Sequence, residues 1–355
     1  MSDMMEKTYN KRPAVDAGLR YSSQDWITNI LTAPFSYILR RVRGQIMFNC
    51  AVCLAVMYFY ESYPGLSIPM TGHSLLASSL GLLVSFRTDS AYQRFWEART
   101  HWTNTKAICR SLAVLVTAHF TEPSPKCTAL FVKQLAAYPA TLMHLCLGGA
   151  AKLSDHAQKF LPVSPDGYRQ YPALPAIYMC RQMQETVHAM FHESKTSKWQ
   201  LTETALHVQT SGLINDLMDN MSSCEKILRT PVPWTYSRHT SRFLTLYLGT
   251  LPFCLIGQLK HTWLVLAITV VVSFCLLGLQ EIGHLIEQPF VGDPLDGREK
   301  IWSSLDDDGE ASALIKRGKT TQPYDIGIPV CSLAEEIRRQ VEDIAAGGGT
   351  MPIEP

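Results

Sequence analysis

The stretch LLASSLGLLVSFRTDSAYQRFWEART, residues 75–100, passes from a segment without charge into one rich in charged and aromatic side chains. Residues 75–83 carry no ionisable group, whereas residues 84–100 carry three arginines, one aspartate and one glutamate. A helix that leaves the hydrocarbon of a membrane has this composition, and Trp and Tyr are common at the boundary. The stretch therefore predicts a helix that leaves a bilayer near Phe86 and Arg87.

The composition excludes some classes of protein. The formal net charge of +1 gives no overall attraction to nucleic acid, so we expect no nucleic-acid partner. The 10 cysteines are scattered, several of them inside apolar runs, which indicates reduced thiols rather than disulfides. No Walker lysine motif, GxGxxG or GxSxG occurs, and the sequence does not favour an enzyme.

Four apolar windows are candidates for membrane spans. They contain no charged residue and cover residues 46–60, 74–86, 243–259 and 263–279. A helix needs about 20 residues to cross a hydrocarbon layer of ~30 Å. The last window alone approaches a sufficient signal, and the other three need their flanks or neighbouring helices to shield polar ends.

The positive charges beside these windows gather on one side of the predicted membrane. The connection 61–72 contains no lysine or arginine, and the turn between the last two windows contains one lysine. By the positive-inside rule this distribution predicts four spans with both chain ends in the cytosol, or in the stroma of a thylakoid. The arginines on that side are Arg40, Arg41, Arg43, Arg87, Arg94, Arg99, Arg229, Arg238 and Arg242.

The windows divide the chain into five predicted parts. They are an N-terminal juxtamembrane segment (1–44), a first transmembrane hairpin (45–99), a helical cytosolic domain (100–242), a second transmembrane hairpin (243–284) and a cytosolic acidic loop with a mobile tail (285–355). Strand signals are scarce, so we expect an all-α membrane protein.

Two amphipathic helices are predicted in the aqueous parts. The first ends at TPVPW, where Pro231 and Pro233 stop it before the third span. Its expected apolar face consists of Leu201, Ala205, Val208, Leu213, Leu217, Met221, Cys224 and Leu228. The second lies in SLAEEIRRQVEDIAAGGG near the C-terminus, before a tail of glycine and proline.

Three blocks of the sequence resemble the bestrophin-like anion channels of bacteria, fungi, algae and plant thylakoids. They are GLLVSFRTDSAYQRFWEAR, TPVPWTYSRHTSRFLTLYLGTLPF and EIGHLIEQPFVGDPLD, in the order and spacing of that family. The resemblance implies a homopentamer around one axial pore, with four membrane helices and a helical cytosolic domain in each subunit. It implies chloride as the permeant ion, with bicarbonate or nitrate as further candidates.

The resemblance also implies a hydrophobic neck on the second membrane helix, at Ser78, Leu82 and Phe86. These residues are four apart, so they share one face of a helix. Rings of Leu82 and Phe86 offer no hydrogen bonds, and a narrow apolar neck excludes water and ions until it widens. The alternative is that Leu82 and Phe86 are lipid-facing or helix-packing residues, as most apolar membrane residues are.

Further site residues follow from the resemblance. A second constriction is expected in the cytosolic domain near Ala205 or Leu206. The arginines after the neck either act on the ion path or form structural ion pairs. We favour the structural role, because Arg94 and Glu97 are three residues apart and can pair within the helix.

A calcium site is not favoured, and no cofactor is expected. The segment QPFVGDPLD keeps only Asp293 and Asp296 as carboxylates at the place of the calcium clasp in animal relatives, and calcium needs six to eight oxygen ligands. Three alternatives to an anion channel stay open: a cation-selective channel of the same fold, a coupled transporter and a non-conducting scaffold. The membrane would be a thylakoid in a photosynthetic source, and otherwise a plasma or bacterial inner membrane.

Overall fold

The structure is a computed structural model that describes residues 36–121, 124–148, 155–161, 171–194, 200–259, 261–290, 328 and 330–347. Within these ranges the regular elements are all helical, and no strand occurs. The prediction of an all-α architecture agrees with this. The N-terminal segment before Ser36, the acidic loop after Phe290 and the tail after Gly347 lie outside the described residues.

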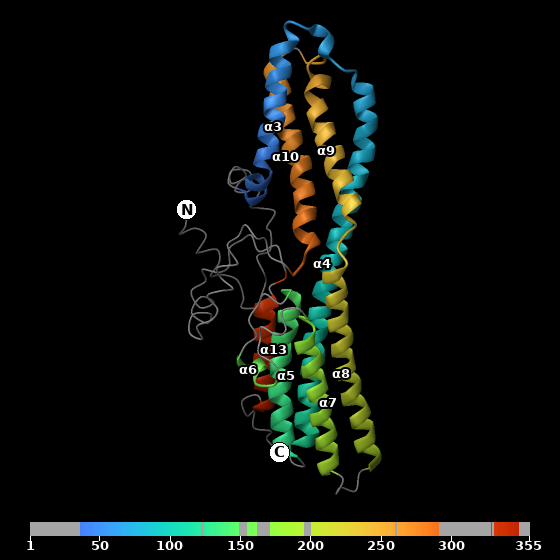
Figure 1. Ribbon diagram of the computed structural model, residues 1–355, viewed down its shortest axis with the longest axis vertical. Coiled ribbons are helices and arrows are strands. Elements are labelled where there is room, and N and C mark those ends of the chain that lie inside the picture. The colour runs from blue at the N-terminus through green and yellow to red at the C-terminus, as the bar shows by residue number, and fades with distance from the viewer. Residues whose placement is uncertain are drawn as a thin grey trace, which may run out of the picture.

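The molecule is elongated and has two helical bundles stacked end to end (Figure 1). The upper bundle packs α3 (Tyr37–Tyr60), α9 (Trp234–Leu255) and α10 (Thr262–Glu287) against the first half of α4 (Met70–Phe120). The lower bundle packs the second half of α4 with four further helices. These are α5 (Pro125–Cys146), α7 (Leu174–Ser194), α8 (Gln200–Arg229) and α13 (Val330–Ala345). The short elements η3 (Pro64–Leu66) and α6 (Asp155–Gln158) lie in connections.

The helix α4 joins the two bundles without a break. With 51 residues and a rise of about 1.5 Å per residue it is about 76 Å long, more than twice the hydrocarbon thickness of a bilayer. One ridge of α4 is buried along its length: Leu80, Val84, Arg87, Ala91, Ala98, Trp102, Cys109, Leu112 and Val116. Because this ridge recurs every three or four residues, the opposite side of α4 is left exposed from end to end.

The upper bundle has a small apolar core and an apolar outer surface. Val42, Leu80, Val84, Leu244 and Leu277 form its lower core layer. Large apolar side chains cover the outside, including Met47, Phe48, Tyr58, Leu75, Leu246, Trp263 and Val271. The helices α3 and α10 are long and apolar enough to cross a membrane, with mean hydropathy of 1.4 and 2.4 in their most apolar windows. An outer surface of this kind needs a cover of lipid or protein.

The lower bundle has the larger core, with α5 at its centre. Phe131, Leu135, Tyr138 and Leu142 of α5 are fully buried, and the Tyr138 hydroxyl donates to the Leu217 carbonyl at 2.9 Å. The predicted C-terminal amphipathic helix is confirmed as α13. Its apolar side (Val330, Ala334, Ile337 and Val341) is buried in the same core.

The end of α8 is confirmed, but part of its predicted apolar face is wrong. The helix ends at Arg229, and α9 begins at Trp234 after Pro231 and Pro233. Val208 is 66% exposed and Ala205 is also exposed, whereas Ile214 is buried. The buried ridge of α8 includes Thr210, and Val208 lies about 200° around the helix from it.

Candidate functional site

The three predicted neck residues lie together on the exposed side of α4. Leu82 is 56% exposed and Phe86 is 58% exposed, and Ser78 is exposed one turn above them. Leu80 and Val84, which alternate with them along the chain, are 1% exposed and pack into the bundle. The structure therefore places Ser78, Leu82 and Phe86 on a face that no other described segment covers.

This face continues into the lower bundle. We call it the α4 stripe and define it by exposed residues at helical spacing: Ser78, Leu82, Phe86, Asp89, Gln93, Trp96, Thr100, Ala107, Ser111, Val114 and Ala118. After Ser78 the stripe is apolar at Leu82 and Phe86. Beyond Phe86 it contains both polar and apolar side chains. Because the α4 stripe is straight and is exposed in both bundles, it could line one continuous path through both of them.

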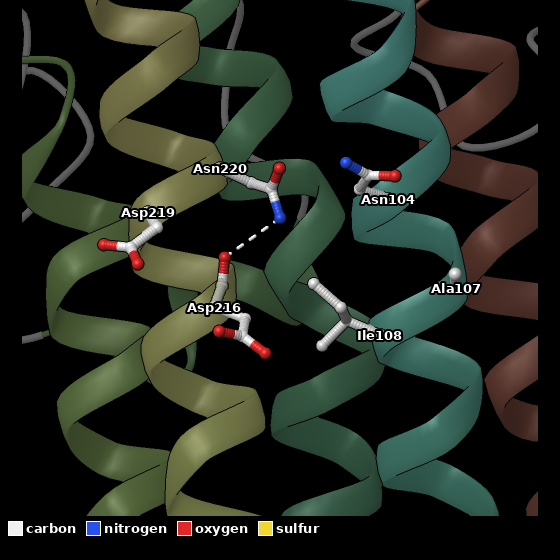
Figure 2. A pocket seen from close by; sticks show the side chains of 6 residues that line it. All are labelled: Asn104, Ala107, Ile108, Asp216, Asp219 and Asn220. Atoms are coloured by element: carbon white, nitrogen blue, oxygen red, sulfur yellow. Dashed lines mark hydrogen bonds between the residues drawn. The ribbon is translucent and has the colours of Figure 1, made fainter.

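A groove of about 310 Å³ lies beside the stripe, between α4 and α8 in the lower bundle. It is lined by Asn104, Ala107, Ile108, Asp216, Asp219 and Asn220 (Figure 2). Asn220 on α8 and Ile108 on α4 point into the space between the helices, and Asp219 points away from α4. The Asn220 amide donates to the Asp216 carbonyl at 2.9 Å, so its side chain is held in place. The carboxylates of Asp216 and Asp219 give this level of the surface a negative charge.

The two candidates for the second constriction point in different directions. Ala205 is exposed, whereas Leu206 is half-buried and packs against the lower core. Sequence reasoning missed the larger apolar side chain at this end, Val208, because it assigned that residue to the buried face. Val114 of α4 is also exposed at this end, at 54%.

The register of α4 and α8 places Val114 and Val208 at the same level. The helices run antiparallel, with Lys226 donating to Glu97 at 2.7 Å and His101 lying 3.0 Å from Asn220. Continued down the antiparallel pair at equal helical rise, this register puts Val114 at about the level of Val208. A helical-spacing argument on α8 alone could not have found this pair, because it depends on which side of α8 meets α4.

Arg94 binds the ends of two other helices at the junction of the bundles. Its Nε donates to the Glu287 carbonyl at 3.1 Å and its Nη2 to the Ile227 carbonyl at 2.5 Å, and its Nη1 donates to the Thr230 carbonyl. Carbonyl groups at helix C-termini lack partners within the helix and carry partial negative charge, which a guanidinium satisfies. Arg94 therefore connects α4 to the ends of α8 and α10.

The expected pair between Arg94 and Glu97 is wrong. Glu97 instead accepts from Lys226, and its carboxylate lies 3.8 Å from the His101 ring. The hydrogen bond from Lys226 lowers the pKa of the Glu97 carboxyl below its ordinary value. The helix termini outcompete Glu97 for Arg94 because they offer three carbonyl oxygens to one planar guanidinium.

Arg87, directly after Phe86, points into the bundle and away from the α4 stripe. Its side chain is buried, and its Nη2 lies 3.5 Å from the Glu287 carboxylate. Arg99 is half-buried. The position of Arg87 favours a structural role over a direct action on ions in a path along the stripe.

Asp293 and Asp296, the weak calcium candidates, lie outside the described residues. Within the described ranges, no group of three or more His, Cys, Asp or Glu residues could hold a metal ion.

Comparison with known proteins places the sequence among membrane channels. Residues 19–296 match the family described as Bacterial/Fungal Bestrophin protein. The chain is 30% identical over 265 residues to a voltage-dependent anion channel-forming protein of Synechocystis, an alignment that covers 73% of this chain and 81% of the relative. It is 27% identical over 281 residues to the chloroplastic voltage-dependent chloride channel 1 of Arabidopsis thaliana, covering 76% of this chain and 65% of that one.

The fold is also similar to a solved structure. A bacterial bestrophin homolog from Klebsiella pneumoniae superimposes with a TM-score of 0.63 at 18% identity. The match covers 86% of this chain and 98% of the homolog.

Proposed function

Because the chain belongs to the bacterial and fungal bestrophin family, we propose that it forms an anion channel in a membrane. The observation that carries the proposal is the α4 stripe, with exposed Leu82 and Phe86 on a helix that extends through both bundles. Exposing an apolar face to water is unfavourable in free energy, so such a face usually has a function. Lining a narrow pore is one such function. The names of the relatives in cyanobacteria and plants support an anion as the permeant ion.

The proposed assembly is a homopentamer in which each subunit contributes four membrane helices. These would be α3, α9, α10 and the upper half of α4, because their outer surfaces carry exposed large apolar side chains. The α4 stripes of five subunits would face the axis. The lower bundles would then lie in the cytosol or stroma.

In this assembly Ser78, Leu82 and Phe86 form three stacked rings at the neck. The rings of Leu82 and Phe86 provide no hydrogen bonds, so a narrow neck stays dry and blocks ions, whereas a widened neck fills with water and conducts. Ser78 makes the outer ring more polar. Val114 and Val208, with Ala205 beside them, are the proposed second constriction.

Chloride is the proposed ion, with bicarbonate and nitrate as further permeant ions. A hydrophobic neck without charged side chains discriminates weakly among small monovalent anions. The chloroplast relative favours a thylakoid membrane if the source is photosynthetic, and a plasma or inner membrane otherwise. The family and the channel names of the relatives favour a channel over an enzyme.

A cation-selective channel of the same fold is the second candidate, and the acidic groove favours it. Asp216 and Asp219 lie at the surface beside the α4 stripe, where they would attract cations. A coupled transporter has less support. Asn49, a polar residue inside the first predicted span, donates to the Ser273 hydroxyl at 3.1 Å, which is a packing role.

The test is bilayer recording of the purified oligomer under a potassium chloride gradient, with bicarbonate then replacing chloride. A reversal potential near the chloride equilibrium value supports the anion channel, and its shift on replacement ranks the two anions. A reversal near the potassium value supports the cation-selective channel instead. The absence of current from intact oligomers would contradict both kinds of channel and would favour the transporter or the scaffold.

A further inference from the structure

Arg87 is a buried cation whose hydrogen-bonding capacity is largely unused. It is 6% exposed, and its Nε and Nη1 have no hydrogen-bond partner among the described residues. Among the described residues its one ion-pair contact is between Nη2 and the Glu287 carboxylate, at 3.5 Å. Buried donors without partners are costly, and a buried guanidinium is especially so. The Nε and Nη1 nitrogens of Arg87, which together carry three N–H groups, therefore require a partner that the described residues do not supply.

Two other buried polar atoms at this end of the upper bundle also lack partners. They are the Oγ of Ser237 on α9 and the Oε1 of Gln280 on α10. Ser237 lies three residues before the fully buried Thr240, and Gln280 lies three residues after the buried Leu277. By helical spacing, both residues continue the buried ridges of their helices, as Arg87 continues that of α4.

Two contacts show that α9 and α10 meet α4 at this level. The hydroxyl of Tyr236, next to Ser237, donates to the Leu83 carbonyl of α4 at 3.1 Å. Gly283 of α10 packs against Thr88, where an added Cβ would lie 3.6 Å from the Thr88 Cα. Arg87 lies between these two positions on α4. From this register we place the unpartnered atoms in one polar layer below the apolar core of the upper bundle.

Among the residues that the structure describes, the charges around this layer do not balance. Arg87 and Arg94 share the single carboxylate residue Glu287: Arg87 contacts its carboxylate, and Arg94 contacts its carbonyl. The other partners of Arg94 are also carbonyl groups, which bring no full negative charge. His284 approaches the same carboxylate at 3.9 Å and adds no negative charge. The nearest further carboxylate on α10, Glu281, is paired with Arg41.

We infer that a small monovalent anion, of the size of chloride or bicarbonate, binds to Arg87 between α4, α9 and α10. The anion accepts hydrogen bonds from Nε and Nη1 of Arg87, and the Ser237 hydroxyl is a further donor. It also balances the second guanidinium, which a water molecule does not. The Gln280 Oε1 accepts from a water beside the anion or from the hydroxyl of bicarbonate.

The site is separate from the proposed pore. Arg87 follows Phe86 directly, but the two side chains leave α4 in directions about 100° apart, one into the bundle and one onto the α4 stripe. A bound anion would hold α4 against α9 and α10 at the cytosolic end of the neck. The binding site does not depend on whether the protein conducts.

The first measurement is the thermal unfolding midpoint of the full-length protein in detergent. Chloride replaces gluconate at constant ionic strength, so that only the nature of the anion changes. We expect a saturable rise of the midpoint with chloride, because a ligand that binds only the folded state stabilises it. Arg87→Gln should abolish the rise. Glu287→Gln should keep it and lower the half-saturating chloride concentration several-fold, since it removes a competing negative charge.

Arg41→Gln is the matched control. It removes a guanidinium from another arginine–glutamate pair at the same end of the bundle and should leave the chloride response unchanged. A wild-type protein without a chloride-specific response, or an Arg87→Gln variant that keeps it, overturns the site.

Crystals grown in bromide provide a test that does not require Arg87→Gln to fold. Anomalous scattering from the wild-type protein should show bromide within hydrogen-bonding distance of Arg87, and its absence there overturns the site. Currents recorded from the same preparation separate this site from the channel function. Binding without current contradicts the channel alone, and current without binding contradicts the site alone.

Discussion

Two arginines of α4, Arg87 and Arg94, bind the ends of other helices where the two bundles meet. Arg94 donates to carbonyls at the ends of α8 and α10, and Arg87 pairs with Glu287 at the end of α10. Both arginines lie just after the point where α4 is expected to leave the membrane. A planar guanidinium can bind several carbonyl oxygens at once, which explains why arginine rather than lysine occupies this crossing.

Arg94→Met should destabilise the folded protein by about 3 kcal/mol, since hydrogen bonds to a charged group contribute about 1.5–3 kcal/mol each and these are partly exposed. Arg94→Lys should recover less than half of the loss, because an ammonium group cannot reach all three carbonyls. Thermal unfolding in detergent measures both changes. Equal stability of the lysine variant and the wild type would contradict the role of the guanidinium geometry.

Phe86→Ala, alone or with Leu82→Ala, should raise the conductance or leak of the assembled channel. The substitution removes a large apolar side chain from the proposed neck, which widens the neck and lets water enter. Single-channel recording measures the change. Leu246→Ala is the control, because Leu246 is an exposed leucine on α9 and not on the α4 stripe. Unchanged currents in intact oligomers of Phe86→Ala would count against the neck.

At the scale of whole elements, helix type was easier to predict than helix orientation. The end of α8 at Arg229 follows from Pro231 and Pro233, and α13 follows from a strong amphipathic pattern. The side of α8 that is buried depends on where α4 and α7 lie, and for this reason Val208 was placed wrongly. The apolar residues predicted for the buried face of α8 are three to five residues apart. Steps of such different length do not stay on one side of a helix.

The docking of α13 onto α4 should weaken in acid. Lys106 donates to Glu336, and this hydrogen bond lowers the pKa of the Glu336 carboxyl below the ordinary value of 4.5. A lowered pKa stabilises the folded state above pH 4.5, and the contribution is lost as the pH falls through the lower folded-state value. The stabilisation is limited to about 1 kcal/mol, because the pair is partly exposed.

Glu336→Gln should therefore have a lower thermal unfolding midpoint than the wild type at neutral pH. In strong acid the two midpoints should be equal. Midpoints measured in a pH series give the comparison. Asp343→Asn is the control, since Asp343 is an exposed carboxylate on the same helix. An identical deficit at neutral and acid pH would show that the ion pair is not the cause.

At the scale of the whole molecule, α4 is the element that gives both bundles a common surface. Its buried ridge serves two cores, one with α3, α9 and α10 and one with α5, α8 and α13. The opposite side stays exposed over about 40 residues from Ser78 to Ala118, which by helical rise is about 60 Å. A pore along this side would run through the membrane part and the cytosolic part of each subunit.

Ala107→Cys should make the current sensitive to a membrane-impermeant, thiol-reactive reagent added on the cytosolic side. Ala107 lies on the α4 stripe beside the acidic groove, so a bulky adduct there should obstruct the proposed path. The background needs Cys275→Ser, because Cys275 is an exposed free thiol. Leu130→Cys on the outside of α5 is the control, and equal loss of current in both variants would argue against a path along the stripe.

The sequence by itself determined the family, the helical class and the stretch where α4 changes from apolar to charged, because these depend on residue type and local spacing. It also identified Ser78, Leu82 and Phe86 as one face, since residues four apart on a helix must share a side. Only the tertiary structure decided the partners of Arg87 and Arg94, the direction of Leu206 and the level shared by Val114 and Val208. These depend on contacts between helices far apart in the chain, and the energy that selects them comes from packing and charge across those contacts rather than from local propensity.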